Sequence, residues 1–147
     1  MKILVINGPN LNMLGVREPG IYGQADYQSL VALVSDTAKE LGVEVECFQS
    51  NHEGAIIDAI QSARTGFDGI VINPGAYTHY SYAILDALKA AEKPAVEVHI
   101  SNIHRREEFR HHSVTAAACD GQICGLGLYG YTAALRYLVA KLSAHED

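Results

Sequence analysis

Hydrogen-bonding side chains gather in a short stretch that follows an apolar run. Residues 69–72 read as a buried strand, and the chain continues Asn73-Pro74-Gly75-Ala76-Tyr77-Thr78-His79-Tyr80-Ser81. Turn chemistry alone accounts for Asn73, Pro74 and Gly75, because Asn, Pro and Gly favour turns. It does not account for the Tyr, Thr and His side chains that follow. Ligands of open α/β sheets bind beyond the carboxyl ends of the strands, so we predict a ligand site here.

A histidine ends another apolar run, and arginines come soon after it. His99 is followed by Arg105, Arg106 and Arg110, in a protein that is acidic as a whole. A histidine in such a place is often only a structural hydrogen bonder, and arginines often only face solvent. If Asn73 and His79 lie opposite His99 in the fold, His99 becomes a candidate general acid or base. The arginines then become candidates for bidentate capture of a carboxylate.

Arg17 and Tyr22 form a further candidate pair in the loop after the first apolar run. A tyrosine has an ordinary pKa of about 10, so it is a poor base at neutral pH. A close cation stabilises the phenolate and makes the tyrosine a stronger candidate. Arg17 is such a cation, although spacing alone leaves a structural role open.

Alternating apolar and helical patterns must position these side chains. The sequence predicts strands at residues 2–7, 43–48, 68–73, 94–100 and 122–128, and helices at residues 27–41, 50–66, 81–92 and 131–143. Asp26 is the expected N-cap of the first helix, and Gly42 is its expected end. Strict alternation predicts an α/β fold: a flavodoxin-like, doubly wound, five-stranded parallel sheet of order 2-1-3-4-5 with helices on both faces. We expect one domain, residues 1–147.

Composition excludes several classes of protein. The net charge is −6, which disfavours binding to nucleic acid or to an anionic membrane. The apolar run at the start is too short for a signal sequence or a membrane span, and no later run is long enough. Cys47, Cys119 and Cys124 form no pattern typical of metal or disulfide sites, so we expect buried thiols in a cytoplasmic protein.

Two patterns suggest ligands that the rest of the sequence does not support. Residues 125–130 match G-x-G-x-x-G, but the chain ends before the strand and acidic residue that a dinucleotide site requires. Close packing of a helix on the sheet is the better interpretation. His104, His111 and His112 have no carboxylate or cysteine at a familiar spacing, so we predict no metal site.

Short motifs, in order along almost the whole chain, resemble those of the type II 3-dehydroquinate dehydratases. They are Asn7-Gly8-Pro9-Asn10-Leu11-Asn12, Arg17-Glu18-Pro19 with Tyr22-Gly23, Gln49-Ser50-Asn51-His52-Glu53-Gly54, Asn73-Pro74-Gly75-Ala76-Tyr77-Thr78-His79, Glu97-Val98-His99-Ile100-Ser101-Asn102 and Phe109-Arg110-His111-His112-Ser113. Residues 114–130 are less typical of the family. They follow the expected site residues, so this difference concerns packing or subunit contacts and not the chemistry.

The resemblance implies loss of water from 3-dehydroquinate through an enolate, with no metal or other cofactor. By this resemblance Tyr22 is the base that removes a proton beside the ketone, and Arg17 favours its tyrosinate. His99 is the general acid for the departing hydroxyl, and Asn12 stabilises the enolate through a water molecule. The pathway remains open between aromatic biosynthesis through shikimate and quinate breakdown.

The resemblance also implies a substrate-binding set and an assembly. The implied binding residues are Asn73, His79, Ile100, Ser101 and Arg110. Asp86 matches a residue that reaches the site of a neighbouring subunit, in a homododecamer built from four trimers. The alternative is a flavodoxin-like binding module that keeps the polar crevice but does not catalyse.

Overall fold

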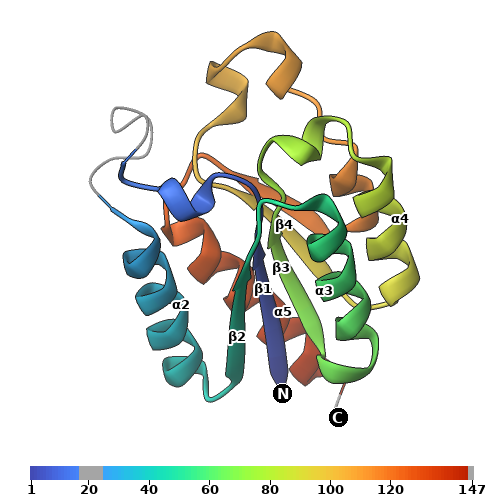
Figure 1. Cartoon of the computed structure of the whole chain (residues 1–147). Helices are drawn as coiled ribbons and strands as arrows, with labels where there is room; N and C mark the ends of the chain where they lie inside the picture. The colour runs from blue at the N-terminus through green and yellow to red at the C-terminus, as the bar shows by residue number, and fades with distance from the viewer. Residues whose placement is uncertain (17–24, 146–147) are drawn as a thin grey trace.

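The computed structural model describes residues 1–16 and 25–145, in which a parallel sheet of five strands has the order β2-β1-β3-β4-β5. Figure 1 shows the strands running the same way, with helices on both sides of the sheet. The strands are β1 (Lys2–Asn7), β2 (Glu44–Gln49), β3 (Gly69–Asn73), β4 (Ala95–His99) and β5 (Gly121–Cys124). The helices are α2 (Tyr27–Leu41), α3 (Glu53–Gly66), α4 (Tyr82–Ala91) and α5 (Tyr129–Ala144), with 3-10 turns η1 (Leu11–Met13), η2 (Gly75–His79), η3 (Ile103–Arg105), η4 (Glu108–Arg110) and η5 (Thr115–Ala118). The predicted fold class is confirmed.

The predicted ends of α2 are also confirmed. The Asp26 carboxylate accepts a hydrogen bond from the Ser29 backbone N–H at 2.8 Å, as an N-cap residue does. Gly42 ends the helix with φ of +71°, a left-handed conformation that suits glycine. This helix follows the loop after the first apolar run, and residues 17–24 of that loop lie outside the described residues.

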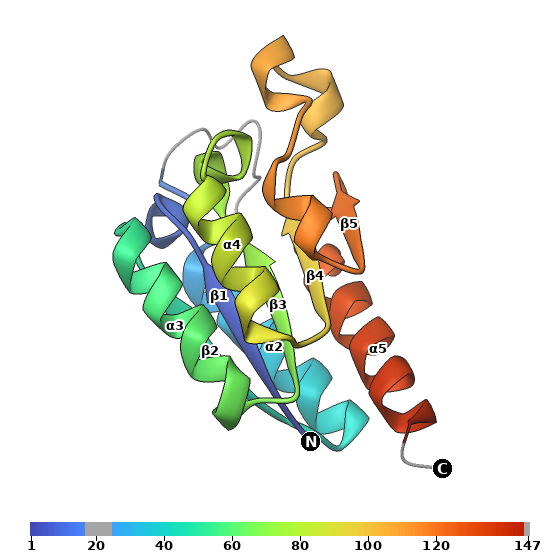
Figure 2. The same ribbon diagram turned by 90° about the vertical axis from the view of Figure 1, so that its right-hand side faces the viewer.

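The sheet separates two hydrophobic cores, because alternate side chains of a strand point to opposite faces. One core lies between the sheet and helices α2 and α5, and it includes Val96 and Val98 of β4. The other lies under α3 and α4, which run side by side in Figure 2, and it includes Ala95 of the same strand. Glu97 and His99 alternate along β4 with Val96 and Val98, as Ala95 does. Their side chains therefore point to the same face of the sheet as that of Ala95, toward α3 and α4.

The fifth strand is shorter than predicted. It ends at Cys124, because Gly125 and Gly127 have φ of +85° and +60° and turn the chain away from an extended path. Helix α5 then begins at Tyr129, ahead of the predicted residue 131. A Cβ on Gly130 would lie 3.1 Å from Cγ1 of Val98, so this glycine lets the helix approach the sheet closely. The close packing predicted for the glycine motif is confirmed.

The connection between β4 and β5 holds three short turns, η3, η4 and η5, which the sequence pattern did not predict. Figure 1 shows η3 and η4 projecting beyond the carboxyl ends of the strands. Cys47, Cys119 and Cys124 are free and only partly buried, and burial raises the pKa of Cys47 to about 11. Among the described residues, no helix is long and apolar enough to cross a membrane.

Candidate active site

A pocket of about 180 Å³ opens beyond the carboxyl ends of β1, β3 and β4. It is lined by Pro9, Asn10, Leu11, Asn73, Gly75, Ala76, His79, His99, Ile100, Ser101, Ile103, Arg106 and Arg110. The structure therefore brings together all the residues expected to bind substrate except Asp86, and it places His99 among them. Asp86 is exposed on α4 and does not line this pocket. Arg17 and Tyr22 lie outside the described residues.

The first strand and the third strand meet closely at the pocket. The backbone N–H of Gly8 donates to the carbonyl of Asn73 at 2.8 Å. A Cβ on Gly8 would lie 2.6 Å from the carbonyl oxygen of Pro74, so no side chain fits there. The glycine thus lets the loop after β1 lie against the loop after β3, as expected for the switch point of a doubly wound sheet.

Asn12 stands in η1, exposed and beside the pocket rather than in its lining. The Gln49 amide lies 3.5 Å from Oδ1 of Asn12 and donates to the Gly8 carbonyl at 3.1 Å. Asn51 accepts a hydrogen bond from the Asn10 backbone N–H at 3.0 Å. Residues at the end of β2 therefore hold the loop that carries Asn12. This is a structural role for the motif at residues 49–54.

His99 is paired with a buried carboxylate on its own strand. Nε2 of His99 lies 2.9 Å from Oε2 of Glu97, and both side chains are nearly or fully buried. Because a carboxylate accepts, Nε2 carries the proton of this hydrogen bond. Nδ1 is then the ring nitrogen left for a ligand in the pocket that His99 lines.

Several donors converge on the Glu97 carboxylate besides His99. Ser113 donates to it at 2.8 Å and Gln122 at 2.7 Å, and the Thr115 hydroxyl donates to its other oxygen. Burial alone would raise the pKa of Glu97, but the hydrogen bonds and charge of His99 and the hydroxyl hydrogen bonds outweigh it and lower this pKa below 4.5. Glu97 is thus a buried carboxylate held in its ionised form.

We predict that the Glu97 carboxylate contributes stability that acid removes. Its pKa is lowered on folding, so this contribution is full above pH 4.5 and is lost as the pH falls through the folded-state pKa. Glu97→Gln should lower the free energy of unfolding by about 2 kcal/mol at pH 7, since its amide leaves buried donors unsatisfied. Urea unfolding at pH 7 and near pH 3 measures the difference. An equal difference at both values would contradict an ionised Glu97.

His79 presents a defined nitrogen to the pocket. Its Nδ1 lies 2.8 Å from the carbonyl oxygen of His112, which can only accept, so Nδ1 carries a proton. Burial lowers the pKa of His79 below 6.5; the hydrogen bond to His112 opposes this, and the charges of His99 and Arg110 add to it. The ring is therefore neutral at pH 7, and Nε2 is an acceptor suited to a hydroxyl group.

Arg110 is held at the mouth of the pocket by its own 3-10 turn. Its Nε donates to Glu107 at 2.7 Å, which leaves the terminal nitrogens of the guanidinium for a ligand. The Phe109 ring lies 4.8 Å from the guanidinium carbon. Arg106 also lines the pocket, and its Nη1 lies 3.5 Å from the Ser101 hydroxyl. Two guanidinium groups therefore suit the pocket to an anionic ligand.

Sequence reasoning missed Glu97 as a site residue. A signal was present: an acidic residue inside an apolar strand, on the same face as His99 and two positions before it. Its partners Ser113 and Thr115 gave no such signal, because they lie in the irregular connection before β5. Gln122 gave none either, because a single polar residue at the start of a predicted strand is common. Among the described residues, no cluster of His, Cys, Asp and Glu side chains suits a metal ion.

Comparisons with known proteins give one answer. Residues 1–139 match the family model described as dehydroquinase class II. The 3-dehydroquinate dehydratase of Thermotoga neapolitana is 65% identical over 147 residues, which cover 100% of this chain and 99% of that protein. That of Clostridium perfringens is 62% identical, with 97% of this chain and 99% of that protein covered.

A solved structure agrees with these sequences. The crystal structure of type II dehydroquinase from Butyrivibrio crossotus superposes with a TM-score of 0.92 at 62% identity, covering 94% of this chain and 97% of that one. The match supports the sheet order and the fold of this chain. The family that the motifs predicted is confirmed: this chain belongs to the class II dehydroquinases, the type II 3-dehydroquinate dehydratases.

Proposed function

We propose that this protein removes water from 3-dehydroquinate to give 3-dehydroshikimate. The observation that carries the proposal is His99, which lines an arginine-containing pocket and is paired at 2.9 Å with the buried Glu97 carboxylate. This pairing fixes the ring and leaves Nδ1 for the substrate, so that the protonated form of His99 can give a proton to a leaving hydroxyl. The family to which the chain belongs supports the choice of reaction.

The reaction begins with proton removal beside the ketone. Tyr22, as a tyrosinate that Arg17 favours, takes the proton, and the electrons of the C–H bond form the enolate. Asn12 stabilises the enolate oxygen through a bound water molecule. The enolate electrons then form the new carbon–carbon double bond as the C–O bond breaks. His99 delivers a proton from Nδ1 to the departing hydroxyl, which leaves as water.

Residues around the pocket hold the substrate during these steps. Arg110 and the Ile100–Ser101 segment bind polar groups of the substrate, including its carboxylate. Nε2 of His79 accepts a hydrogen bond from a hydroxyl group, in keeping with the tautomer deduced from the His112 contact. Asn73 offers an amide that can both donate and accept. The substrate is thus placed for the base on one side and for His99 on the other.

We also propose the assembly and setting that the resemblance implies. Asp86 is exposed on α4 and away from the pocket of its own chain, so it is available to complete the site of a neighbouring subunit. This fits a homododecamer of four trimers. The protein then works in the cytoplasm, without a cofactor, in aromatic biosynthesis through shikimate or in quinate breakdown.

The test is to mix the purified protein with 3-dehydroquinate and a metal chelator, and to follow the ultraviolet band of the conjugated product. We expect the band to rise. A flat trace from folded dodecamers would overturn the proposed reaction and leave the binding module. A flat trace from smaller species, sized by sedimentation, would instead point to failed assembly and a site without the neighbour's Asp86.

A further inference from the structure

We propose that Tyr131, on helix α5, is a positioning residue that fixes the orientation of the Asn73 amide for substrate binding. This inference rests on the proposed function, because it assigns Tyr131 a part in binding the substrate of that reaction. Tyr131 does not line the pocket, and it acts through Asn73, which does.

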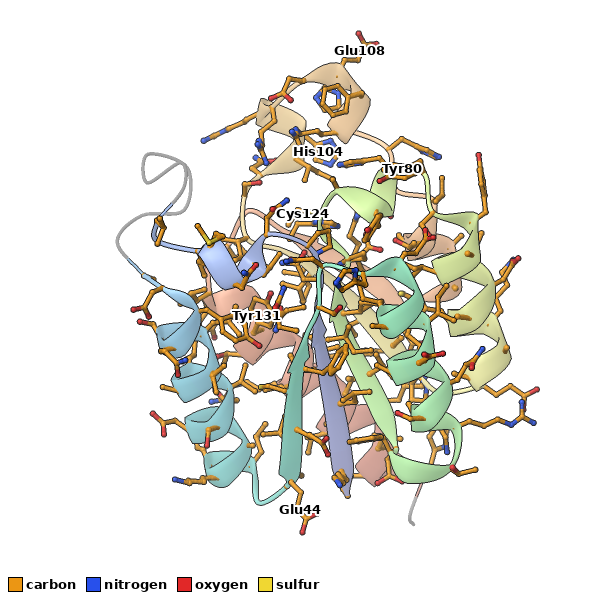
Figure 3. All side chains as sticks on the ribbon, viewed as in Figure 1. Glu44, Tyr80, His104, Glu108, Cys124 and Tyr131 are labelled. Carbon is orange, nitrogen blue, oxygen red and sulfur yellow. The ribbon has the colours of Figure 1, made fainter. Side chains whose placement is uncertain are left out.

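The Tyr131 hydroxyl joins two buried amides at the ends of the central strands. It donates to Oδ1 of Asn7 at 2.6 Å and accepts from Nδ2 of Asn73 at 2.9 Å. Tyr131 and Asn7 are completely buried, and Asn73 is 4% exposed. Figure 3 shows Tyr131 inside the molecule, far from the projecting segment that carries Glu108. Burial raises the pKa of Tyr131 above its ordinary value of 10, so the hydroxyl keeps its proton at neutral pH.

Hydrogen-bond chemistry determines which way the Asn73 amide points. The backbone N–H of Gly75 lies 3.1 Å from the side chain of Asn73, and an N–H can only donate, so the atom facing it is Oδ1. Nδ2 must then face Tyr131, whose hydroxyl accepts there and sends its own proton to Asn7. Asn7 keeps this orientation although its Nδ2 has no hydrogen-bond partner among the described residues.

This arrangement leaves a defined pair of groups for the pocket. One N–H of Asn73 is used by Tyr131, and one lone pair of its oxygen is used by Gly75. One N–H and one lone pair remain. Together they match a hydroxyl group, which both donates and accepts. If the Asn73 amide were flipped, its NH₂ and its oxygen would exchange places. The NH₂ would then face the Gly75 N–H, and two donors would oppose each other.

The glycine motif explains how a tyrosine reaches this place. Gly130 lets the first turn of α5 approach Val98 of the sheet, and the next residue inserts between the strand ends and α2. The Tyr131 ring packs in the core shared by α2 and α5, so its hydroxyl cannot move far from Asn7 and Asn73. The glycine motif at residues 125–130 thus serves the packing of α5 on the sheet, and this role requires no nucleotide.

The experiment is a double-mutant cycle on the steady-state constants for 3-dehydroquinate. Tyr131→Phe should raise KM about tenfold and change kcat less than about threefold, because a misplaced amide weakens binding of the substrate and of the transition state alike. In an Asn73→Ala background the same change should alter KM less than about twofold. Tyr137→Phe on the same helix is the matched control, since its hydroxyl donates to Asp120 on the surface, and KM should not change.

Each outcome decides the question. An unchanged KM in Tyr131→Phe, or an equal rise with and without Asn73, would show a structural role only and would overturn the inference. If Tyr131→Phe does not fold, Asn7→Ala tests the same point. The hydroxyl then loses its acceptor and competes for Oδ1 of Asn73, so KM should rise only where Asn73 is present. An inactive wild-type protein would instead count against the proposed reaction.

Discussion

His99→Gln is expected to lower kcat for 3-dehydroquinate by about 10³-fold, because general acid catalysis typically contributes about 10²- to 10⁴-fold. The glutamine amide can still donate to Glu97, so the buried carboxylate keeps its partners and the fold should survive. What is lost is the group whose Nδ1 gives a proton to the departing hydroxyl. KM should change little, since the rest of the pocket remains. Initial rates at saturating substrate measure the effect.

His104→Ala is the control for this variant. His104 is exposed on η3, in the projecting segment visible in Figure 3, and it does not line the pocket. Its removal should leave kcat within about twofold, as is usual for a change of an exposed side chain outside the pocket lining. A His99→Gln protein that is folded and retains most of its activity would rule out His99 as the acid.

Tyr22→Phe is expected to abolish turnover to a similar degree, by about 10³-fold or more in kcat, because phenylalanine cannot accept the proton beside the ketone. Binding should persist, since the pocket formed by Asn73, His79 and Arg110 is untouched. Equilibrium binding of substrate to the inactive variant, measured by calorimetry, separates the loss of chemistry from the loss of binding. A pure binding module would show the same affinity in both proteins and no turnover in either.

Tyr27→Phe provides the comparison for Tyr22. Tyr27 begins helix α2, and burial raises its pKa above the ordinary value of 10, with the charge of Cys47 adding to this effect. Such a tyrosine is a weaker acid than free tyrosine, so it is unsuited to work as a tyrosinate. Activity should therefore be nearly unchanged. A large loss in Tyr27→Phe together with an active Tyr22→Phe would contradict the assignment of the base.

Much of this fold could be predicted, because its central strands β1, β3 and β4 are buried on both faces. β1 and β3 are continuous apolar runs that only a covered parallel sheet accommodates, and they lie side by side as the order 2-1-3-4-5 requires. The end of β5 could not be predicted as well. Its apolar run continues past Cys124, but Gly125 and Gly127 have positive φ angles, and Gly125 lies so close to Asn102 that an added Cβ would be 2.9 Å from the Asn102 Cβ. Periodicity does not reveal such a contact.

The candidate site was predictable where its residues follow strands. Asn73 and His99 end β3 and β4, and parallel strands bring such ends to one edge of the sheet. The residues that tune the site were not predictable. Besides His99, Ser113 and Thr115 help to keep Glu97 ionised, and they reach it from an irregular connection whose path has no regular pattern in the sequence. Tyr131 reads as one more apolar position of a helix.

The bond between Tyr131 and Asn7 joins positions 124 residues apart. On the ribosome, all the described residues that line the pocket have been synthesised once position 110 has been added. Asn73 nevertheless finds its partner only after residue 131 has emerged and its helix has docked. The pocket in its full form therefore belongs to the finished chain. A chain truncated before Tyr131 would carry all these lining side chains, but it would lack the Tyr131 hydroxyl that orients the Asn73 amide.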